Sequence, residues 1–284
     1  MNSPKLLLCT DMDRTVIPNG FEPEHPDARK RFKQFCSNTN VTLVYVTGRH
    51  IALVKHAIHN YALPKPNYVI SDVGTKIYHM VDDQWSEMPE WETEIDKDWK
   101  GYKPLDIKQF LNPINELILQ ESSKQNTHKL SYYLPLYLDN GDVIRRMESI
   151  LAAIDIDVSI IWSLDEPKNT GLIDVLPRHA TKLHAIEFLQ KKLKYSLEQV
   201  IFAGDSGNDL PVLASQINAV LVDNASNDIK VEAQKLALAN GNVKMLYIAN
   251  SSNLEMKGNY SAGVLEGVWH YAPEFRDILN IKEK

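Results

Sequence analysis

The sequence predicts an α/β protein in which a parallel, Rossmann-like sheet is interrupted by an inserted α+β unit. The first and last thirds both alternate short apolar, β-branched runs with helical patterns, and this alternation is typical of βαβ units. Between about Met80 and Gly171 the texture changes to an acidic, tryptophan-bearing stretch followed by helix–strand–helix–strand patterns. We therefore expect a core formed by residues 1–79 and 172–284 and an inserted domain formed by residues 80–171.

The elements follow from hydrophobic periodicity, and their ends follow from glycine and proline punctuation. In the first third we expect strands at Lys5–Thr10, Val41–Val46 and Tyr68–Ile70 and helices at Asp27–Ser37 and His50–Tyr61. In the last third we expect strands at Leu172–Leu176, Val200–Ala203, Ala219–Val222 and Met245–Ala249 and helices at Thr181–Lys194, Asp209–Ser215, Ser226–Leu236 and Ser261–Tyr271. The two ends of the chain are thus predicted to be halves of one sheet.

In the inserted unit we expect helices at Leu105–Glu121 and Asp142–Ile154 and strands at Lys129–Leu134 and Val158–Trp162. Trp85, Trp91 and Trp99 are expected to anchor the packing of this small unit rather than to bind a ligand, and the acidic run Glu90–Asp98 is most simply a solvated surface.

Composition favours a cytoplasmic protein with a small ligand. The formal net charge of −6 opposes attraction to nucleic-acid backbones and anionic lipid, so we expect neither as a partner. The apolar opening Leu6–Cys9 is cut short by Asp11, which leaves it too short for a signal peptide, and no later run approaches a bilayer-spanning length. Cys9 and Cys36 have no paired spacing and are expected to be buried thiols.

Two clusters of acids follow predicted strands. Asp11 and Asp13 come at the end of the first strand, and Gly204–Asp209, with Asp205 and Asp209, comes directly after Val200–Ala203. Ligands of open α/β sheets bind at this carboxyl edge. The alternation of a strand would point Asp11 and Asp13 apart, so both can serve one site only if the chain turns immediately after Asp11. Clustered carboxylates need a cation, and an all-oxygen set suits Mg²⁺.

Two further signals lie at the same predicted edge. Thr47, Gly48 and Arg49 end the strand Val41–Val46 with a hydroxyl, a flexible backbone and a guanidinium, at a strand-to-helix junction where backbone N–H groups bind phosphate oxygens. Lys182 stands at the start of a predicted helix. A Thr-Gly-Arg turn or a lysine at the start of a helix is common in proteins. Each supports a binding site here because both are predicted at the same edge of the sheet as the two acidic clusters.

Taken in order, Asp11–Thr15, Thr47, Lys182 and Gly204–Asp209 resemble the four motifs of the haloacid dehalogenase (HAD) superfamily of phosphotransferases. The inserted unit, between the second and third motifs, matches the position of a type II cap, here type IIB. Two further segments, Val69–Tyr78 and Gly258–His270, are similar to those of the sucrose-phosphate phosphatase family. In many type II-capped relatives a small residue follows the lysine, whereas Leu183 and His184 follow Lys182.

The resemblance implies a Mg²⁺-dependent phosphatase that acts through an aspartyl-phosphate. It assigns Asp11 as nucleophile and Asp13 as general acid and base, and a crowded, partly desolvated Asp13 is expected to be protonated in the first step. The implied metal ligands are Asp11, the backbone carbonyl of Asp13, and Asp205, with Asp209 orienting bound waters. The implied phosphate-gripping residues are Thr47, Lys182 and Asn208. We expect the loops at the ligand edge to contact substrate through Gly48, Arg49, Ser71, Gly74 and Thr75.

On this basis we expect the substrate to be sucrose 6-phosphate, with mannosylfructose phosphate and glucosylglycerol phosphate as alternatives. A non-catalytic module of the kind fused to sucrose-phosphate synthases is a further alternative, which the intact acidic set argues against. Carbon–halogen cleavage is another alternative activity. It requires neither a second aspartate such as Asp13 nor a magnesium cluster, so the presence of Asp13 argues against it. A synthase is a candidate partner, and we expect a monomer because type II caps shield the site without a second subunit.

Overall fold

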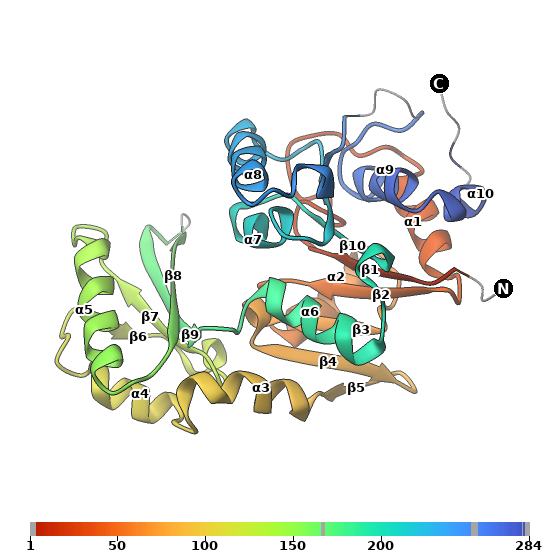
Figure 1. Ribbon diagram of the computed structural model, residues 1–284. Coiled ribbons are helices and arrows are strands. Elements are labelled where there is room, and N and C mark those ends of the chain that lie inside the picture. The colour runs from red at the N-terminus through yellow and green to blue at the C-terminus, as the bar shows by residue number, and fades with distance from the viewer. Residues whose placement is uncertain (1–3, 166–167, 251–254, 280, 282–284) are drawn as a thin grey trace. The chain divides into compact units, whose positions relative to one another are not determined.

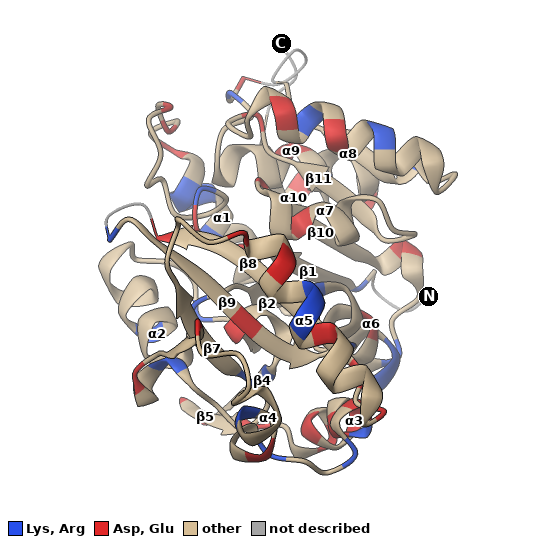
Figure 2. Ribbon diagram, turned by 90° about the vertical axis from the view of Figure 1, so that its left-hand side faces the viewer, with Lys and Arg blue, Asp and Glu red and all other residues tan. Residues whose placement is uncertain are grey.

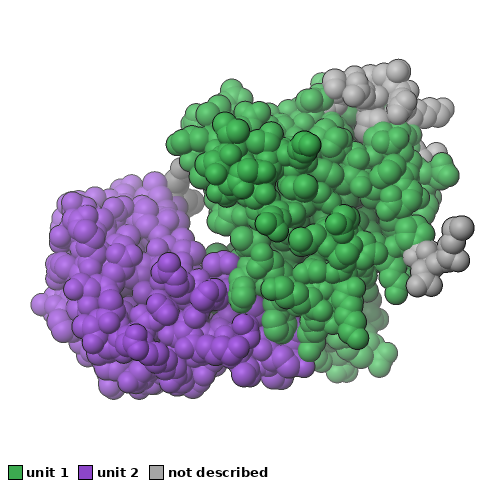
Figure 3. All heavy atoms as spheres, viewed as in Figure 1, with its two compact units in different colours: residues 1–87, 182–284 green, residues 88–181 purple. Residues whose placement is uncertain are grey.

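The computed structural model describes residues 4–165, 168–250, 255–279 and 281. These residues form two compact units, which Figure 3 distinguishes by colour. The larger unit comprises residues 1–87 and 182–284, and the smaller unit comprises residues 88–181. Each unit has its own sheet and its own hydrophobic core. No helix among the described residues combines the length and the apolar character needed to cross a bilayer.

The larger unit contains a sheet of eight strands in the order β12-β11-β10-β1-β2-β3-β4-β5. Their bounds are β1 (Leu6–Thr10), β2 (Val41–Val46), β3 (Tyr68–Ser71), β4 (Lys76–Val81), β5 (Gln84–Glu87), β10 (Val200–Gly204), β11 (Asn218–Leu221) and β12 (Leu246–Ile248). The strands from β12 to β3 pair in parallel, while β4 and β5 add an antiparallel hairpin at one side (Figure 1). The predicted α/β class and parallel sheet are therefore confirmed, and the hairpin is an addition.

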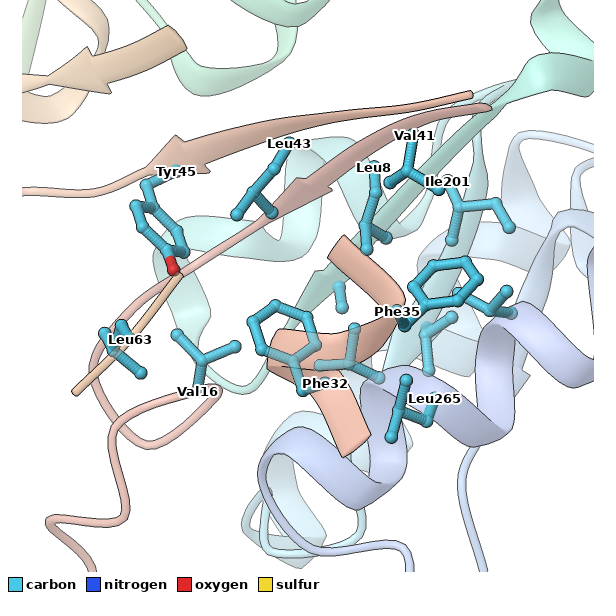
Figure 4. Close-up of a cluster of buried hydrophobic side chains, with 14 of the residues drawn as sticks. Leu8, Val16, Phe32, Phe35, Val41, Leu43, Tyr45, Leu63, Ile201 and Leu265 are labelled. Carbon is cyan, nitrogen blue, oxygen red and sulfur yellow. The ribbon is translucent and has the colours of Figure 1, made fainter. Parts of the chain in front are cut away.

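The helices of this unit are α1 (Ala28–Cys36), α2 (Ile51–Asn60), α6 (Lys182–Leu193), α7 (Leu210–Leu213), α8 (Asn227–Ala239), α9 (Ser261–Tyr271) and α10 (Arg276–Leu279). Phe32 and Phe35 of α1 pack beside Leu8 of β1 and Leu265 of α9 in one buried cluster (Figure 4). Helix α8 carries both acidic and basic residues (Figure 2), which is typical of a solvated face.

The central position of β1 matters most for the site. Its five residues are all buried, and it pairs with β10 on one side and β2 on the other. Strands buried on both faces are almost continuously apolar, as Leu6-Leu7-Leu8-Cys9 is. The carboxyl ends of β10, β1 and β2 consequently meet at one edge, so the residues that follow them are brought together.

The smaller unit contains the antiparallel sheet β6-β7-β9-β8 and three helices. Their bounds are α3 (Pro89–Trp99), α4 (Pro104–Leu111), β6 (Ile118–Leu119), β7 (Leu130–Leu134), α5 (Asn140–Ala153), β8 (Val158–Asp165) and β9 (Thr170–Pro177). Trp91 and Trp99 are fully buried, as expected of packing anchors. The acidic run that we expected to be a solvated surface is the helix α3, and its Ile95 and Asp98 are buried too.

Two expectations for this region differ from the structure. Residues 172–176 were expected to be a strand of the core sheet, but they lie in β9, which pairs with β7 and β8 of the smaller unit. The helix expected over residues 105–121 ends at Leu111, because Pro113 follows and proline is incompatible with a helix interior. The two units accordingly meet in the sequence at Glu87–Met88 and Thr181–Lys182, rather than near residues 80 and 171.

Candidate active site

The turn required by the first acidic pair is present. Asp11 extends β1 by one residue, since its amide donates to Ala203 O of β10 at 2.8 Å. The chain then turns sharply: the amides of Thr15, Val16 and Ile17 all donate to Met12 O, and Arg14 takes a left-handed conformation at φ 55°. This turn overrides the alternation of a strand, so that the chain after Asp11 does not continue along the strand direction.

Asp205 and Asp209 follow β10 in a tight loop. One carboxylate oxygen of Asp209, Oδ2, accepts the amides of Asp205 at 3.1 Å and Ser206 at 3.0 Å. The loop closes over Gly204, where an added Cβ would lie 2.6 Å from the Asp209 carboxyl carbon. Only glycine leaves room for this approach, so Gly204 places Asp209 against the end of the strand.

The acids from the two strand ends converge. Asp11, Asp205 and Asp209 each offer a carboxylate oxygen, and these three atoms lie within 4.8 Å of one another. All three residues are buried. The Lys182 ammonium, at the start of α6, donates to Asp11 Oδ1 at 2.7 Å, Asp209 Oδ1 at 2.8 Å and Asn208 Oδ1 at 3.0 Å. The structure thus brings Asp11, Lys182, Asn208, Asp205 and Asp209 into one cluster.

Burial makes the ionised carboxylates of this cluster unfavourable unless positive charge lies close to them. Desolvation, reinforced by Asp209, raises the pKa of Asp205 to about 6. Desolvation also raises the pKa of Asp11, although Lys182 opposes it. Burial lowers the pKa of Lys182, but Asp11 and Asp209 outweigh it and the ammonium stays charged. Three carboxylates then face Lys182 and, at Asp205, Arg14, and a hard cation with oxygen ligands fits the remaining negative charge.

Asp13 differs from its expected state. Its carboxylate accepts Arg49 Nε at 2.7 Å and Arg49 Nη2 at 2.6 Å. It also accepts Asn19 Nδ2 at 2.8 Å. Burial alone would raise the pKa of Asp13, but the Arg49 fork and the Asn19 amide more than offset it and hold the pKa below its usual range. We expected Asp13 to be protonated in the first chemical step, whereas in the fold without substrate the neighbouring guanidinium favours its ionised form.

The loops after β2 and β3 are joined to each other. The Val73 amide donates to Thr47 O at 3.2 Å, and the Asp72 amide donates to Arg49 O at 3.1 Å. Gly48 lies against this loop, since a Cβ there would be 3.9 Å from Val73 Cγ2. Thr47 is buried, and its hydroxyl accepts the Arg49 amide at 3.2 Å. These contacts hold the loop after β2 against the loop after β3.

The second of these loops has an unusual backbone. Asp72, Val73 and Gly74 have φ values of 49°, 63° and 106°. A left-handed valine is strained because its β-branch crowds the backbone. Ser71 and Thr75 flank the strained segment, and both are buried: Ser71 Oγ donates to Asp72 Oδ2 at 3.1 Å, and Thr75 Oγ1 donates to Asp72 O at 3.0 Å. Of the expected substrate-contacting residues, Arg49 is thus committed to Asp13, while Ser71 and Thr75 hold the loop.

Three site residues had no assigned role in the sequence analysis. Thr15 Oγ1 donates to Asp205 Oδ1 at 3.2 Å, and Arg14 Nε donates to Asp205 Oδ2 at 3.3 Å. Both follow Asp13 within the first motif, so their place in the chain is a usable signal. Asn19, which contacts Asp13, lies outside every motif and carries no such signal.

Comparison with known proteins identifies the family. The family model described as sucrose-6F-phosphate phosphohydrolase matches residues 4–272. The chain belongs to this family. The chain is accordingly a phosphoric monoester hydrolase of the HAD superfamily, as the motifs predicted.

Individual relatives agree with the family. A Nitrosococcus oceani protein described as a HAD-like hydrolase is 45% identical over 272 residues, covering 96% of this chain and 73% of its own length. The mannosylfructose-phosphate phosphatase of Agrobacterium fabrum is 30% identical over 228 residues, covering 78% of this chain and 84% of its own. Among solved structures, the sucrose-phosphatase of Synechocystis sp. PCC6803 in complex with sucrose and phosphate aligns with TM-score 0.71 at 23% identity, covering 94% of this chain and 98% of its own.

Proposed function

We infer that the chain hydrolyses sucrose 6-phosphate to sucrose and phosphate through an aspartyl-phosphate. The observation that carries the phosphatase chemistry is the buried convergence of Asp11, Asp205 and Asp209, with the Lys182 ammonium donating to Asp11 and Asp209. The choice of sucrose 6-phosphate rests on membership of the sucrose-6F-phosphate phosphohydrolase family. Mannosylfructose phosphate and glucosylglycerol phosphate are not favoured, and the hydrolase family argues against a non-catalytic module.

In the first step an Asp11 carboxylate oxygen attacks phosphorus and the bond from phosphorus to the sugar oxygen breaks. The electron pair of that bond goes to the sugar oxygen, which takes a proton from Asp13. In the second step water gives a proton to Asp13 and attacks phosphorus. The bond between phosphorus and the Asp11 oxygen then breaks, and its electron pair returns to the Asp11 carboxylate. Splitting hydrolysis in this way replaces one high barrier with two lower ones.

Charge compensation comes from the surrounding groups. Lys182 touches Asp11 directly, so it is placed to meet a phosphate oxygen beside the attacking carboxylate. Asp11, Asp205 and Asp209, with the backbone carbonyl of Asp13, would hold Mg²⁺. When bound, Mg²⁺ neutralises the charge that develops on the phosphoryl oxygens. Thr47 and Asn208 would complete the contacts to the phosphoryl group, and positioning of this kind accounts for most of the catalysis in phosphoryl transfer.

We assign selection of the sugar to the smaller unit and to the loops Thr47–Arg49 and Ser71–Thr75. The acidic cluster handles only the phosphoryl group, so discrimination between leaving groups requires other surfaces. A monomeric, cytoplasmic state and association with a synthase stay predictions. Size-exclusion chromatography with in-line light scattering tests the first of these.

The experiment for the proposed function is phosphate release from a matched panel of sucrose 6-phosphate, mannosylfructose phosphate and glucosylglycerol phosphate. We expect the highest kcat/KM with sucrose 6-phosphate. The Asp11→Asn variant is the control: it is nearly isosteric, and it should lose turnover with every substrate while keeping its far-UV circular dichroism. A higher kcat/KM for another member of the panel would overturn the substrate, and near-normal turnover by Asp11→Asn would overturn the covalent step.

A further inference from the structure

Asn19 makes a double contact with the first motif. Its side-chain Nδ2 donates to Asp13 Oδ1 at 2.8 Å, while its Oδ1 accepts the backbone amide of Arg14 at 2.8 Å. The two partners fix the orientation of the amide group. If it were flipped, an oxygen would face the Asp13 carboxylate and an NH₂ group would face the Arg14 N–H, and both contacts would be repulsive.

The backbone holds Asn19 in place independently of its side chain. The Asn19 amide donates to Ile17 O at 2.9 Å, and Asp13 and Ile17 form an isolated β-bridge. Pro18 precedes Asn19 and restricts the backbone further. The segment after β1 therefore presents the Asn19 side chain to Asp13 from a rigid turn, although Asn19 itself is exposed.

The other partner of Asp13 is of a different kind. Arg49 approaches both carboxylate oxygens from the loop after β2 and forms an ion pair, whereas Asn19 is neutral and contacts Oδ1 only. A guanidinium binds a carboxylate much more strongly than a neutral acid, but an amide N–H donates to the carbonyl oxygen of either form. The Asn19 contact is therefore compatible with both the ionised and the protonated form of Asp13.

We propose that Asn19 is a positioning residue that holds the Asp13 carboxyl group in the orientation needed for proton transfer to the leaving oxygen. This inference rests on the proposed function, because it assigns Asn19 a role only through the general acid. It makes a specific kinetic claim. In the first step Asn19 should matter for a leaving group that needs a proton, such as a sugar oxygen, and should matter little for p-nitrophenolate, which leaves without one.

The experiment compares kcat/KM with sucrose 6-phosphate and with p-nitrophenyl phosphate for the wild type, Asn19→Ala, Asn19→Asp and Asp13→Asn. This ratio reports the steps up to departure of the leaving group and excludes the second step, in which Asp13 acts as a base for both substrates. We expect Asn19→Ala to lower kcat/KM for the sugar phosphate by about 10- to 100-fold and for p-nitrophenyl phosphate by less than about threefold. Asn19→Asp retains an acceptor for the Arg14 amide but cannot donate to Asp13, so it should show the same selective loss. The Asn19→Asp variant tests the proposal if Asn19→Ala does not fold.

Asn38→Ala is the matched control. The Asn38 side chain also accepts a backbone amide, that of Asn40 at 2.9 Å, but lies outside the acidic cluster and should leave both substrates unaffected. Equal losses with the two substrates, or full sugar-phosphate activity in Asn19→Asp, would overturn the proposal. Asp13→Asn separates the two levels: if it lacks the selective loss, the general-acid assignment fails, and if it alone shows the loss, only the role of Asn19 fails.

Discussion

At the scale of single residues, the acidic cluster works because each carboxylate has a defined set of partners. Asp209 accepts two backbone amides and the lysine, Asp205 accepts Thr15 and Arg14, and Asp11 accepts Lys182. A carboxylate held by several donors does not have to reorganise when the substrate arrives. Such preorganised contacts account for a large part of catalysis in phosphoryl transfer.

The Gly204→Ala substitution tests the packing behind this arrangement. A Cβ at Gly204 would lie 2.6 Å from both the carboxyl carbon and Oδ2 of Asp209. The Asp209 carboxylate accepts hydrogen bonds from Lys182 and two backbone amides, so moving it away from the added Cβ would break these bonds. We expect Asp209 to be displaced, with Mg²⁺ affinity by calorimetry falling about tenfold or more. Gly207→Ala in the same loop is the control, because its Cβ would meet only Ile229 Cδ1 at 3.7 Å. Equal affinities in the two variants would contradict the close-packing argument.

The pH dependence of stability is also a residue property. Asp205 has a pKa of about 6 in the metal-free fold, against about 3.9 for an unfolded aspartate. Between these values the folded state holds more protons, so the contribution of Asp205 to stability is lost as pH rises from about 4 to 6. In chelator, acidification from about pH 7 to 5 should therefore stabilise the wild type relative to Asp205→Asn, by roughly 1 kcal/mol in urea unfolding. Parallel pH profiles for the two proteins would show that Asp205 is not the responsible group.

At the scale of elements, helix α3 stabilises the smaller unit through its tryptophans. Trp99 is fully buried among Ile107, Leu130 and Met147, and its Nε1 has no hydrogen-bond partner among the described residues. Its contribution is therefore apolar packing. Trp99→Ala should cost about 3–5 kcal/mol and should reduce amide-exchange protection across residues 88–181. Leu105→Ala on α4, where the side chain is 70% exposed, should leave protection unchanged.

The sequence predicted most elements of the larger unit because their strands are buried on both faces and bounded by turns. Strand β2 and helix α9 fall within the predicted bounds, Val41–Val46 and Ser261–Tyr271. Strand β9 was assigned to the core sheet because a short apolar run does not say which sheet it joins. Its burial alternates, with Ile173 and Val175 fully buried and Asp174 between them only partly so. This pattern is typical of an antiparallel strand with one buried face.

The site was predicted only as far as strand ends determine it. Asp11, Asp205, Asp209 and Lys182 converge because they follow or face the edge of one sheet. The pairing of Asp13 with Arg49 and Asn19 depends on side-chain conformations in two loops, and no pattern in the sequence encodes these. The positive φ values at Asp72–Gly74 could not be predicted from the sequence either, because valine rarely adopts a positive φ and an aspartate alone does not predict one.

At the scale of the whole molecule, the two units should respond differently to Mg²⁺. All of the clustered carboxylates belong to residues 1–87 and 182–284. A ligand that binds only the folded form stabilises it by mass action. Saturating Mg²⁺ should therefore slow amide exchange in the larger unit and leave residues 88–181 unchanged, and excess chelator should remove both the protection and the phosphatase activity. Undiminished activity in chelator would contradict the metal assignment, while uniform protection of both units would contradict the location of the site.

Because β1 lies between β2 and β10, the nucleophile and its supporting groups are made at very different times during synthesis. Asp11 leaves the ribosome before β2, which can then pair with β1, but the partner strand on the other side begins only at Val200. Residues 88–181 emerge in between as a unit with its own core. A nascent or truncated chain that stops before Asp205 consequently has Asp11 without Asp205 and Asp209, so the acidic cluster forms only after synthesis has passed Asp209.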